Sequence, residues 1–491
     1  MKYEIKKRAV AIGVGSIILI AAFGMNGIYA KKSNYPNDNA GRWVAGDFHT
    51  HTFLTDGSKT EKEVVEKAFE EYGLDWMANS EHGGTSKYDP FGKAFSSPVF
   101  RWITLSYYSY PILNAFREEY PNKKLIQGVE WNVPTHEHAS VGIISDAPMD
   151  ISNFEYIFDA SDKDTSRSNE GLTKNNKTHE DAIKGVKWLE ENYKDSSYFI
   201  LNHPSRKLKY SPSDIRDFNN AAPSVAIGFE GIPGHQKESC RGGYESTKDN
   251  AKTYGGADYM LAKVGGLWDS LLGEGRNFWV FANSDFHNID GDFWPGEYEK
   301  NYTFVEGNDY KSLVSGFRSG NSFAVEGDLI NGLEFGVEKN KKYAQMGEEF
   351  KVSKGNTVKI TIRFKSPKRN NNGDKVKVDH IDLIAGSVTG KALPGTDEYS
   401  KDTNKTTRVI ASFNEEDWEK EDGGWYACEY QTRIDNNMYF RLRGTNLGLN
   451  VTNETDANGN PLCDELVGTN NENKAYSDLW FYSNPLFVSV K

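Results

Sequence analysis

Cysteine is scarce in this sequence, with three residues (Cys240, Cys428 and Cys463) in a chain of 491. An odd number cannot pair completely within one chain, which excludes a fold held together by a disulfide framework. Cys428 and Cys463 are candidates for one bridge, although free thiols are the expected state. Basic residues are not in excess either, because 58 Lys and Arg face 70 Asp and Glu. The net charge of −12 argues against a nucleic-acid surface, which needs clustered cations.

Two catalytic motifs are also absent. The sequence has no G-x-S-x-G segment, which would place a serine nucleophile on a sharp turn, and no P-loop that would cradle a nucleotide phosphate. Hydrolysis by a serine nucleophile and P-loop chemistry are therefore not expected.

The main long apolar run lies at the N-terminus. A basic start precedes an apolar stretch from Ala9 to Phe23, and the small residue Ala30 precedes Lys31. This pattern predicts a secretory signal peptide over residues 1–30, and hence a secreted or cell-surface protein. The stretch is shorter than the roughly 20 residues of a spanning helix. Because Ile28 is unusual at its position before the cleavage site, an uncleaved N-terminal anchor is the alternative; no other membrane association is expected.

Short apolar runs alternate with helical periodicity over residues 41–330. The expected strands are 43–48, 74–80, 124–131, 140–145, 197–204, 224–231 and 277–287. Helical stretches lie between several of them, notably 60–73, 178–193 and 256–272. In the first helix Ser58 and Glu61 offer a capping box, and Gly73 marks the end. This alternation predicts an α/β domain with a parallel sheet or a barrel of βα units.

The pattern changes from residue 332 to residue 491. Alternating strand-like runs are separated by Gly, Asn, Asp and Lys clusters, and no long amphipathic helix is evident. The runs are 355–366, 378–387, 406–413, 424–434, 438–444 and 479–490. The second domain is therefore predicted to be an antiparallel β-sandwich.

Residue types that bind metals gather at the ends of the expected strands of the first domain. In βα barrels, functional residues lie at the carboxyl ends of the strands. Two histidines at i and i+2 on an extended segment point to the same side, as in His49-Thr-His51. Imidazoles and carboxylates together suit Mn, Fe or Zn, and a carboxylate such as Glu130 can bridge two ions. The nine candidate ligands, enough for two or three divalent ions, are His49, His51, Asp56, His82, Glu130, His138, His203, Asp285 and His287.

The ordered motifs HTH, DG, EH, GVE, H, NHP and SDFH resemble the polymerase and histidinol phosphatase (PHP) superfamily of metal-dependent phosphoesterases. The resemblance covers about residues 43–287, and the segment HASVGI is most similar to a secreted branch that includes a carbamate hydrolase. It implies a distorted seven-stranded βα barrel that holds a trinuclear or dinuclear site on the nine residues above. Two positions depart from the family pattern. Asp56 stands where some members have histidine, and Glu81 stands where aspartate is common; Glu81 is expected to orient His82.

The other histidines are assigned by position. His136 competes with His138 as a ligand, and His138 is favoured because it belongs to the matching segment. His179 lies at a helix start and is expected to be structural, and His380 has no partner pattern. In the Gly-rich loop 230–244, Arg241 is a candidate to grip the phosphoryl oxygens and His235 is a candidate proton donor to the leaving group.

The expected activity is hydrolysis of a small-molecule phosphoric ester by water activated on the divalent ions. Hydrolysis of carbamates or carboxylic esters by the same kind of site is one alternative. An amidohydrolase is disfavoured because such enzymes use a bridging lysine and fewer ligands. An exported surface-binding protein with a non-catalytic barrel is the alternative from a different class.

Overall fold

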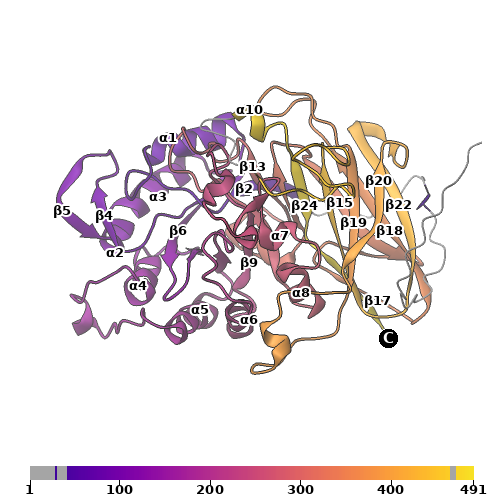
Figure 1. Ribbon diagram of the computed structural model, residues 1–491. Helices are drawn as coiled ribbons and strands as arrows, with labels where there is room; N and C mark the ends of the chain where they lie inside the picture. The colour runs from indigo at the N-terminus through magenta and orange to yellow at the C-terminus, as the bar shows by residue number, and fades with distance from the viewer. Residues whose placement is uncertain (1–27, 30–40, 465–471) are drawn as a thin grey trace, which may run out of the picture.

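The computed structural model describes residues 28–29, 41–464 and 472–491. The predicted signal peptide therefore lies outside the described residues, except for the two-residue strand β1 (Ile28–Tyr29), which pairs with a strand of the C-terminal half. Over the described part of the chain, no helix has the length and apolar character needed to cross a membrane. Helices and strands alternate in the indigo-to-magenta half of the molecule, and strands dominate the orange-to-yellow half (Figure 1).

Seven neighbouring strands form the N-terminal part of the largest sheet. They are β2 (Arg42–Asp47), β3 (Trp76–Asn79), β6 (Lys124–Asn132), β7 (His138–Ile143), β8 (Ser197–Leu201), β9 (Ala226–Ile232) and β12 (Trp279–Ala282). Their order is β12-β9-β8-β7-β6-β3-β2, and all pairs are parallel except the two made by β7. Strands β8, β9 and β12 are buried along their whole length, as expected of strands covered on both faces.

The two outer strands of this set also meet just beyond their carboxyl ends. Thr50, after β2, forms an isolated parallel bridge with Phe286, after β12. The amide of His51 donates to the carbonyl oxygen of Phe286 at 2.9 Å. The carboxyl ends of β2 and β12 are thereby held next to each other.

Helices follow most of these strands. They are α1 (Glu61–Glu66) continued by the π-helix η1 (Lys67–Glu71), α2 (Arg101–Thr104) continued by the π-helix η2 (Leu105–Ser109) and α3 (Tyr110–Glu119), α4 (Met149–Phe158), α5 (His179–Tyr193), α6 (Pro212–Ala221), α7 (Tyr259–Ala262), α8 (Leu267–Gly273) and α9 (Tyr310–Ser319). Along one side of the molecule α4 packs on α5 and α5 on α6 (Figure 1).

Two of the expected helices differ in detail from the structure. The capping box of α1 is formed by Thr60 and Glu63, so the predicted pair of Ser58 and Glu61 was two residues too early. The single helix expected over 256–272 is two short helices, α7 and α8. Lys263, directly after α7, is extended (φ −74°, ψ 103°) and ends the first helix, and Gly265 has a φ of +77° in the turn that follows.

Shorter strands complete this half. They are β4 (Thr85–Tyr88) paired with β5 (Ala94–Phe100), β10 (Thr253–Tyr254) paired with β11 (Ala257–Asp258), and β13 (Glu299–Val305) and β14 (Ser322–Glu326), which extend the large sheet beyond β2. Short 3-10 turns occur at Ser168–Glu170, Arg241–Gly243, Asp249–Ala251, Asp397–Ser400 and Asp422–Gly424.

The C-terminal half is built of β15 (Gly332–Lys339), β16 (Lys342–Gln345), β17 (Glu349–Val352), β18 (Asn356–Lys365), β19 (His380–Ser387), β20 (Arg408–Asn414), β21 (Glu419–Lys420), β22 (Trp425–Ile434), β23 (Met438–Thr445), α10 (Glu472–Ala475), β24 (Trp480–Ser483) and β25 (Leu486–Val490). A separate antiparallel sheet has the order β1-β22-β18-β15-β16. Alternate side chains of β18, such as Ile360 and Ile362, share one apolar core with Leu383 of β19 and Leu442 of β23. The core thus lies between the separate sheet and the far end of the large sheet.

The large sheet runs from one half into the other. Beyond β13 and β14 it continues through β24, β23, β19 and β20, because β14 pairs with β24. The last run of the sequence, expected as one strand over 479–490, is divided at Asn484–Pro485 into β24 and β25. The three cysteines are free thiols, and Cys428 is buried in the core of the C-terminal half.

Candidate metal centre

The nine candidate ligands come from one end of the strand set. His49 and His51 follow β2, His82 follows β3, His203 follows β8, and Asp285 with His287 follows β12. Glu130 lies within β6, where it forms an isolated parallel bridge with His82. Because β7 runs opposite to its neighbours, its first residue, His138, lies at the same end as the carboxyl ends of the others.

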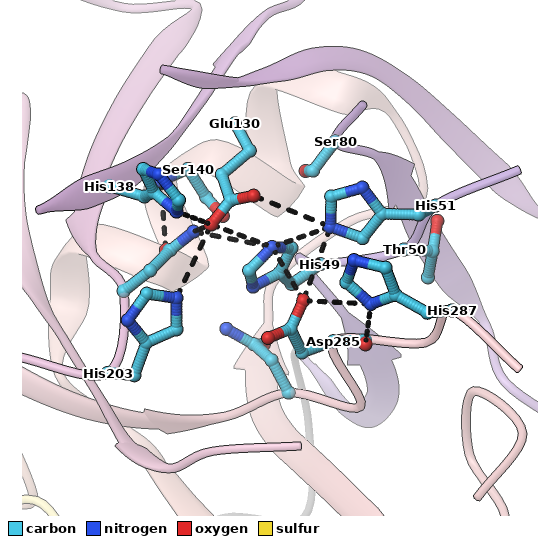
Figure 2. Close-up of polar contacts among 12 residues, drawn as sticks. His49, Thr50, His51, Ser80, Glu130, His138, Ser140, His203, Asp285 and His287 are labelled. Atoms are coloured by element: carbon cyan, nitrogen blue, oxygen red, sulfur yellow. Dashed lines mark hydrogen bonds and ion pairs between the residues drawn. The ribbon is translucent and has the colours of Figure 1, made fainter. Parts of the chain in front are cut away.

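Glu130 and Asp285 are the centre of the cluster (Figure 2). Oε1 of Glu130 lies 3.0 Å from Nδ1 of His138 and 3.4 Å from Nε2 of His203. Its Oε2 lies 2.8 Å from Nδ1 of His82. Asp285 Oδ1 lies 3.1 Å from Nε2 of His49. One carboxylate therefore faces several imidazoles at once, as expected of a group shared between ions.

Asp56, His82 and His287 lie at the more exposed side of the cluster. Oδ2 of Asp56 lies 3.2 Å from Nε2 of His82, and Oδ1 lies 3.4 Å from Nε2 of His287. The rings of His51 and His287 stack with their centres 4.0 Å apart. Ligand atoms of His51, Asp56, His82 and His287 lie within 4.8 Å of one another, as do those of His49, His51 and Glu130.

The orientation of the histidines fits bound cations. Nδ1 of His49 faces Oε1 of Glu230 at 3.0 Å, and a carboxylate can only accept there. In the neutral ring, the lone pair of Nε2 then points at the carboxylates of Glu130 and Asp285, an arrangement that is repulsive unless a positive charge lies between. Buried ligand atoms without a hydrogen-bond partner are Nδ1 of His51, Oε2 of Glu130, Nδ1 of His138, both nitrogens of His203 and Oδ1 of Asp285. Buried polar atoms normally have partners, so these residues fit a metal cluster.

The pKa shifts of these side chains also indicate that the cluster favours bound positive charge. Burial alone would raise the pKa of Glu130, but the imidazoles of His138, His82 and His49 hold it well below its usual range. Burial would lower the pKa of His49, yet Asp285, Glu130 and Glu230 raise it well above its ordinary value. In contrast, burial lowers the pKa of His203 to about 4, with Arg206 contributing. The neutral imidazole that a metal requires is therefore favoured at His203.

Buried residues outside the nine hold this arrangement. Glu230 accepts the backbone N–H of His203 at 2.9 Å, and Asp47 accepts that of His49 at 2.8 Å. The amide nitrogen of Asn202 donates to Oε1 of Glu130 at 3.0 Å. The two backbone contacts fix the chain at His49 and His203, and the Asn202 side chain helps to hold the carboxylate of Glu130.

Backbone strain coincides with the cluster. His203 has a φ of +30° and Asp285 a φ of +43°, and His235 in the neighbouring loop has a φ of +58°. Non-glycine residues adopt such values at a cost that the surrounding structure must offset, and they gather at functional sites.

Glu81 does not contact the ring of His82, contrary to the expected role. Its buried carboxylate accepts hydrogen bonds from the backbone N–H of Thr52, at 3.0 Å, and from the hydroxyl groups of Thr52 and Thr55. The reason is local geometry, because the loop that leads from His51 to Asp56 passes over Glu81. Glu81 thus positions the Asp56 loop.

The two residues expected to act on the substrate lie in different places. Nε2 of His235 is 3.0 Å from Oδ2 of Asp285, and its Nδ1 is 2.6 Å from Oδ1 of the buried Asp292. Arg241 is not in the cluster. Its guanidinium is bound by Asp478 at 2.7 Å, by the hydroxyl of Tyr298 at 2.7 Å and by Gln236 at 2.6 Å.

Arg206 is a further candidate for the site that the sequence reasoning missed. Its Nη1 lies 3.8 Å from Oδ2 of Asp285, and its Nη2 lies 3.4 Å from Oε1 of Glu137. The side chain is 15% exposed, and its buried Nε has no hydrogen-bond partner. Its place in the sequence, three residues after the strand-end His203, was the signal that could have found it.

The remaining histidines fall outside the cluster. His138 contacts Glu130 whereas His136 pairs with His179, so the choice of His138 agrees with the geometry. His179 is the first residue of α5, directly after the capping residue Thr178. His380 contacts Asp379 in the C-terminal half.

Comparisons with known proteins give little further support. A scan against protein-family models and a search of curated proteins find no match. Among solved structures, the chain is similar to a two-domain protein from Bacteroides vulgatus ATCC 8482 that contains a predicted PHP-like metal-dependent phosphoesterase. The two are 12% identical, the match covers 88% of this chain and 97% of that chain, and the TM-score is 0.38.

Proposed function

We propose that this protein is a metal-dependent hydrolase of the PHP type that cleaves small-molecule phosphoric esters on two or three divalent ions. The observation that carries the proposal is the convergence of six imidazoles and three carboxylates from distant parts of the chain. Their unpartnered, buried ligand atoms face one another. The bridge between Thr50 and Phe286 supports a seven-stranded barrel as the scaffold.

The residues divide into three sets around the shared carboxylate. His49, His51, Glu130 and Asp285 would hold one ion, and Glu130, His138 and His203 a second. Asp56, His82 and His287 would hold a third. Imidazole with carboxylate suits Mn, Fe or Zn. Divalent ions bound there would supply Lewis acidity and lower the pKa of coordinated water.

Arg206 is the side chain best placed to bind the anionic substrate. Its guanidinium lies at the edge of the cluster, with Asp285 and Glu137 as its nearest acidic partners. Lys207 and Lys209 also form ion pairs with Glu137. Arg206 is therefore not needed to neutralise the charge of that carboxylate. A guanidinium can hold two phosphoryl oxygens at once. Arg206 would therefore take the role first expected of Arg241.

His235 remains the candidate to handle the proton of the leaving group. Asp292 fixes its Nδ1, which aims Nε2 at Asp285 beside the cluster. Asp292 also accepts the backbone N–H of His287 at 2.6 Å, so one buried carboxylate positions both histidines.

The test is turnover and metal content of the purified protein. The protein would be loaded separately with Mn²⁺, Fe²⁺ and Zn²⁺ and assayed on phosphomonoesters, phosphodiesters, carbamates and carboxylic esters. We expect phosphoester turnover that a chelator abolishes and added metal restores. His49→Gln should lower turnover by more than the roughly 100-fold typical of replacing a residue that only supports a ligand. His380→Gln is the matched control and should retain activity.

Two outcomes would contradict the proposal. Turnover of carbamates or carboxylic esters alone would retain the metal centre and reject the phosphoester assignment. A protein that binds no divalent ion, or a His49→Gln variant as active as the unmodified protein, would reject the metal-dependent mechanism.

A further inference from the structure

Three ligand-type residues meet outside the cluster described above. His136 lies in the loop 133–137 between β6 and β7, His179 is the first residue of α5, and Asp214 lies in the first turn of α6. Ligand atoms of the three lie within 4.8 Å of one another. None of the three belongs to the nine candidate ligands of the cluster.

The outward nitrogen of each ring is held by an acceptor. Nδ1 of His136 is 3.0 Å from the carbonyl oxygen of Lys209, and a carbonyl can only accept, so Nδ1 carries the hydrogen. Nε2 of His179 faces Oδ2 of Asp217 at 3.3 Å. The other carboxylate oxygen of Asp217 accepts from the hydroxyl of Tyr399 at 2.6 Å. Carbonyl and carboxylate partners of this kind support metal-binding histidines.

The inward nitrogens are left facing each other. Nε2 of His136 and Nδ1 of His179 are 2.9 Å apart. With the outward nitrogens protonated, both inward nitrogens of neutral rings carry a lone pair. Two lone pairs at that distance repel, whereas moving the hydrogen of His179 to Nδ1 would leave the bare Nε2 facing the Asp217 carboxylate. A cation between the rings removes both repulsions. The cation is either one extra proton or a metal ion.

Asp214 is the third ligand-type residue of this group. Its Oδ2 accepts the backbone N–H of Ser211 at 2.8 Å, which fixes the carboxylate, and its Oδ1 lies 3.8 Å from Nδ1 of His179. The ring of His136 is stacked on Tyr210 with an interplanar angle of 8°. Both side chains are therefore held in place before any ion binds.

We propose that His136, His179 and Asp214 form a separate site for one divalent transition-metal ion, with Zn²⁺ the best fit. Two imidazoles and a carboxylate are typical zinc ligands and leave a fourth position for water. The site joins the loop before His138 to the first turns of two helices. A bound ion would hold the segment that delivers Glu137 and His138 to the cluster.

The test counts zinc per chain after equilibrium dialysis, by mass spectrometry. We expect His179→Ala to bind one equivalent less than the unmodified protein. Asp214→Asn, which preserves the side-chain shape, should also lose that equivalent. Glu180→Gln, an exposed neighbour on the same helix turn, is the matched control and should lose none. Melting temperatures measured without metal show whether each variant is folded.

A second background separates this site from the cluster. Glu130→Gln removes the shared carboxylate of the cluster, and adding His179→Ala to it should remove one further equivalent. If the cluster binds no metal, Glu130→Gln changes nothing while His179→Ala still loses one equivalent. The proposal is overturned if both His179→Ala and Asp214→Asn retain the full zinc count, which would assign the inward contact to a shared proton.

Discussion

Glu230 is a single buried residue that directs two candidate ligands. Its Oε1 faces Nδ1 of His49 at 3.0 Å, and its Oε2 accepts the backbone N–H of His203 at 2.9 Å. We expect Glu230→Gln to lower metal affinity and turnover by roughly 10- to 100-fold, since an amide orients His49 less strongly. Metal titration followed by activity assays measures this. Glu238→Gln, in the loop after β9, is the control, and equal affinity in both variants would contradict the role.

Arg206 differs from its neighbour Lys207 in what it faces. Both contact Glu137, but only Arg206 also lies beside Asp285 in the cluster. Arg206→Gln should lower kcat/KM on a phosphoester by roughly 10- to 100-fold, because a hydrogen bond to a charged group contributes about 1.5–3 kcal/mol. Lys207→Gln should change it less than about threefold. Steady-state kinetics of the two variants test this prediction. Equal losses of kcat/KM would exclude a specific contact between Arg206 and the substrate.

The convergence of the candidate ligands could be predicted from residue type and position, but the residues that support them could not. The nine ligand candidates were found because imidazoles and carboxylates stood at the ends of apolar runs. Glu230 also ends such a run, yet it faces His49 as an outer support, and sequence does not distinguish the two roles. Arg241 has the right chemistry, but Asp478, far along the chain, binds it instead.

The helix α1 begins with a buried carboxylic acid, Glu61. Burial, followed by the charge of Glu81, raises the pKa of Glu61 to about 8. The folded protein therefore keeps a proton that the unfolded chain releases above its ordinary pKa of 4.5. Between these two values the folded state binds more protons, so the free energy of unfolding falls as the pH rises.

Glu61→Gln should remove that pH dependence. We expect the variant to gain stability over the unmodified protein on the order of a few kcal/mol near pH 8, and little near pH 4.5. Urea unfolding at a series of pH values measures it. Glu66→Gln, on the same helix but with a side chain 40% exposed, should keep the slope. A Glu61→Gln curve parallel to that of the unmodified protein would contradict the prediction.

The strands were predicted more closely than the helices. The run 424–434 is β22 (Trp425–Ile434) and the run 378–387 contains β19 (His380–Ser387). Alternation marks a strand without marking its direction, so the reversal of β7 was missed. The loop 133–137 did carry the signal, because a parallel crossover needs about a dozen residues or more. The helix α4 was missed because it is mostly buried and shows little amphipathic contrast.

Arg241 connects the two halves of the molecule. It joins the loop after β9 to Asp478, just before β24, and Glu326 of β14 lies 3.6 Å away. Arg241→Met should lower the free energy of unfolding by about 3–5 kcal/mol, because buried carboxylates lose their cation. At temperatures where the variant is folded, kcat/KM should change less than about twofold.

Urea unfolding and kinetics on the same sample test this prediction. Arg241→Lys, which retains the charge, should recover part of the stability. A large rise in KM with unchanged stability would restore Arg241 as a substrate ligand and exclude the connecting role.

The two patterns of the sequence predicted two kinds of architecture, and the structure joins them through one sheet. The spacing of apolar residues differs between residues 41–330 and 332–491. Parallel strands joined by helices produce one periodicity, and antiparallel strands joined by turns produce another. Nothing in either pattern indicates that β14 pairs with β24. Pairing between strands so distant in sequence depends on tertiary packing, which local patterns do not encode.

The position of β24 also determines when the large sheet can be completed during synthesis. It lies between β14 and β23, both of which leave the ribosome earlier. Until β24 emerges, β14 and β23 each present an open edge with unpaired backbone groups, and such edges invite pairing with other chains. Nascent molecules are thus exposed to aggregation until β24 has been synthesised and has paired with both strands.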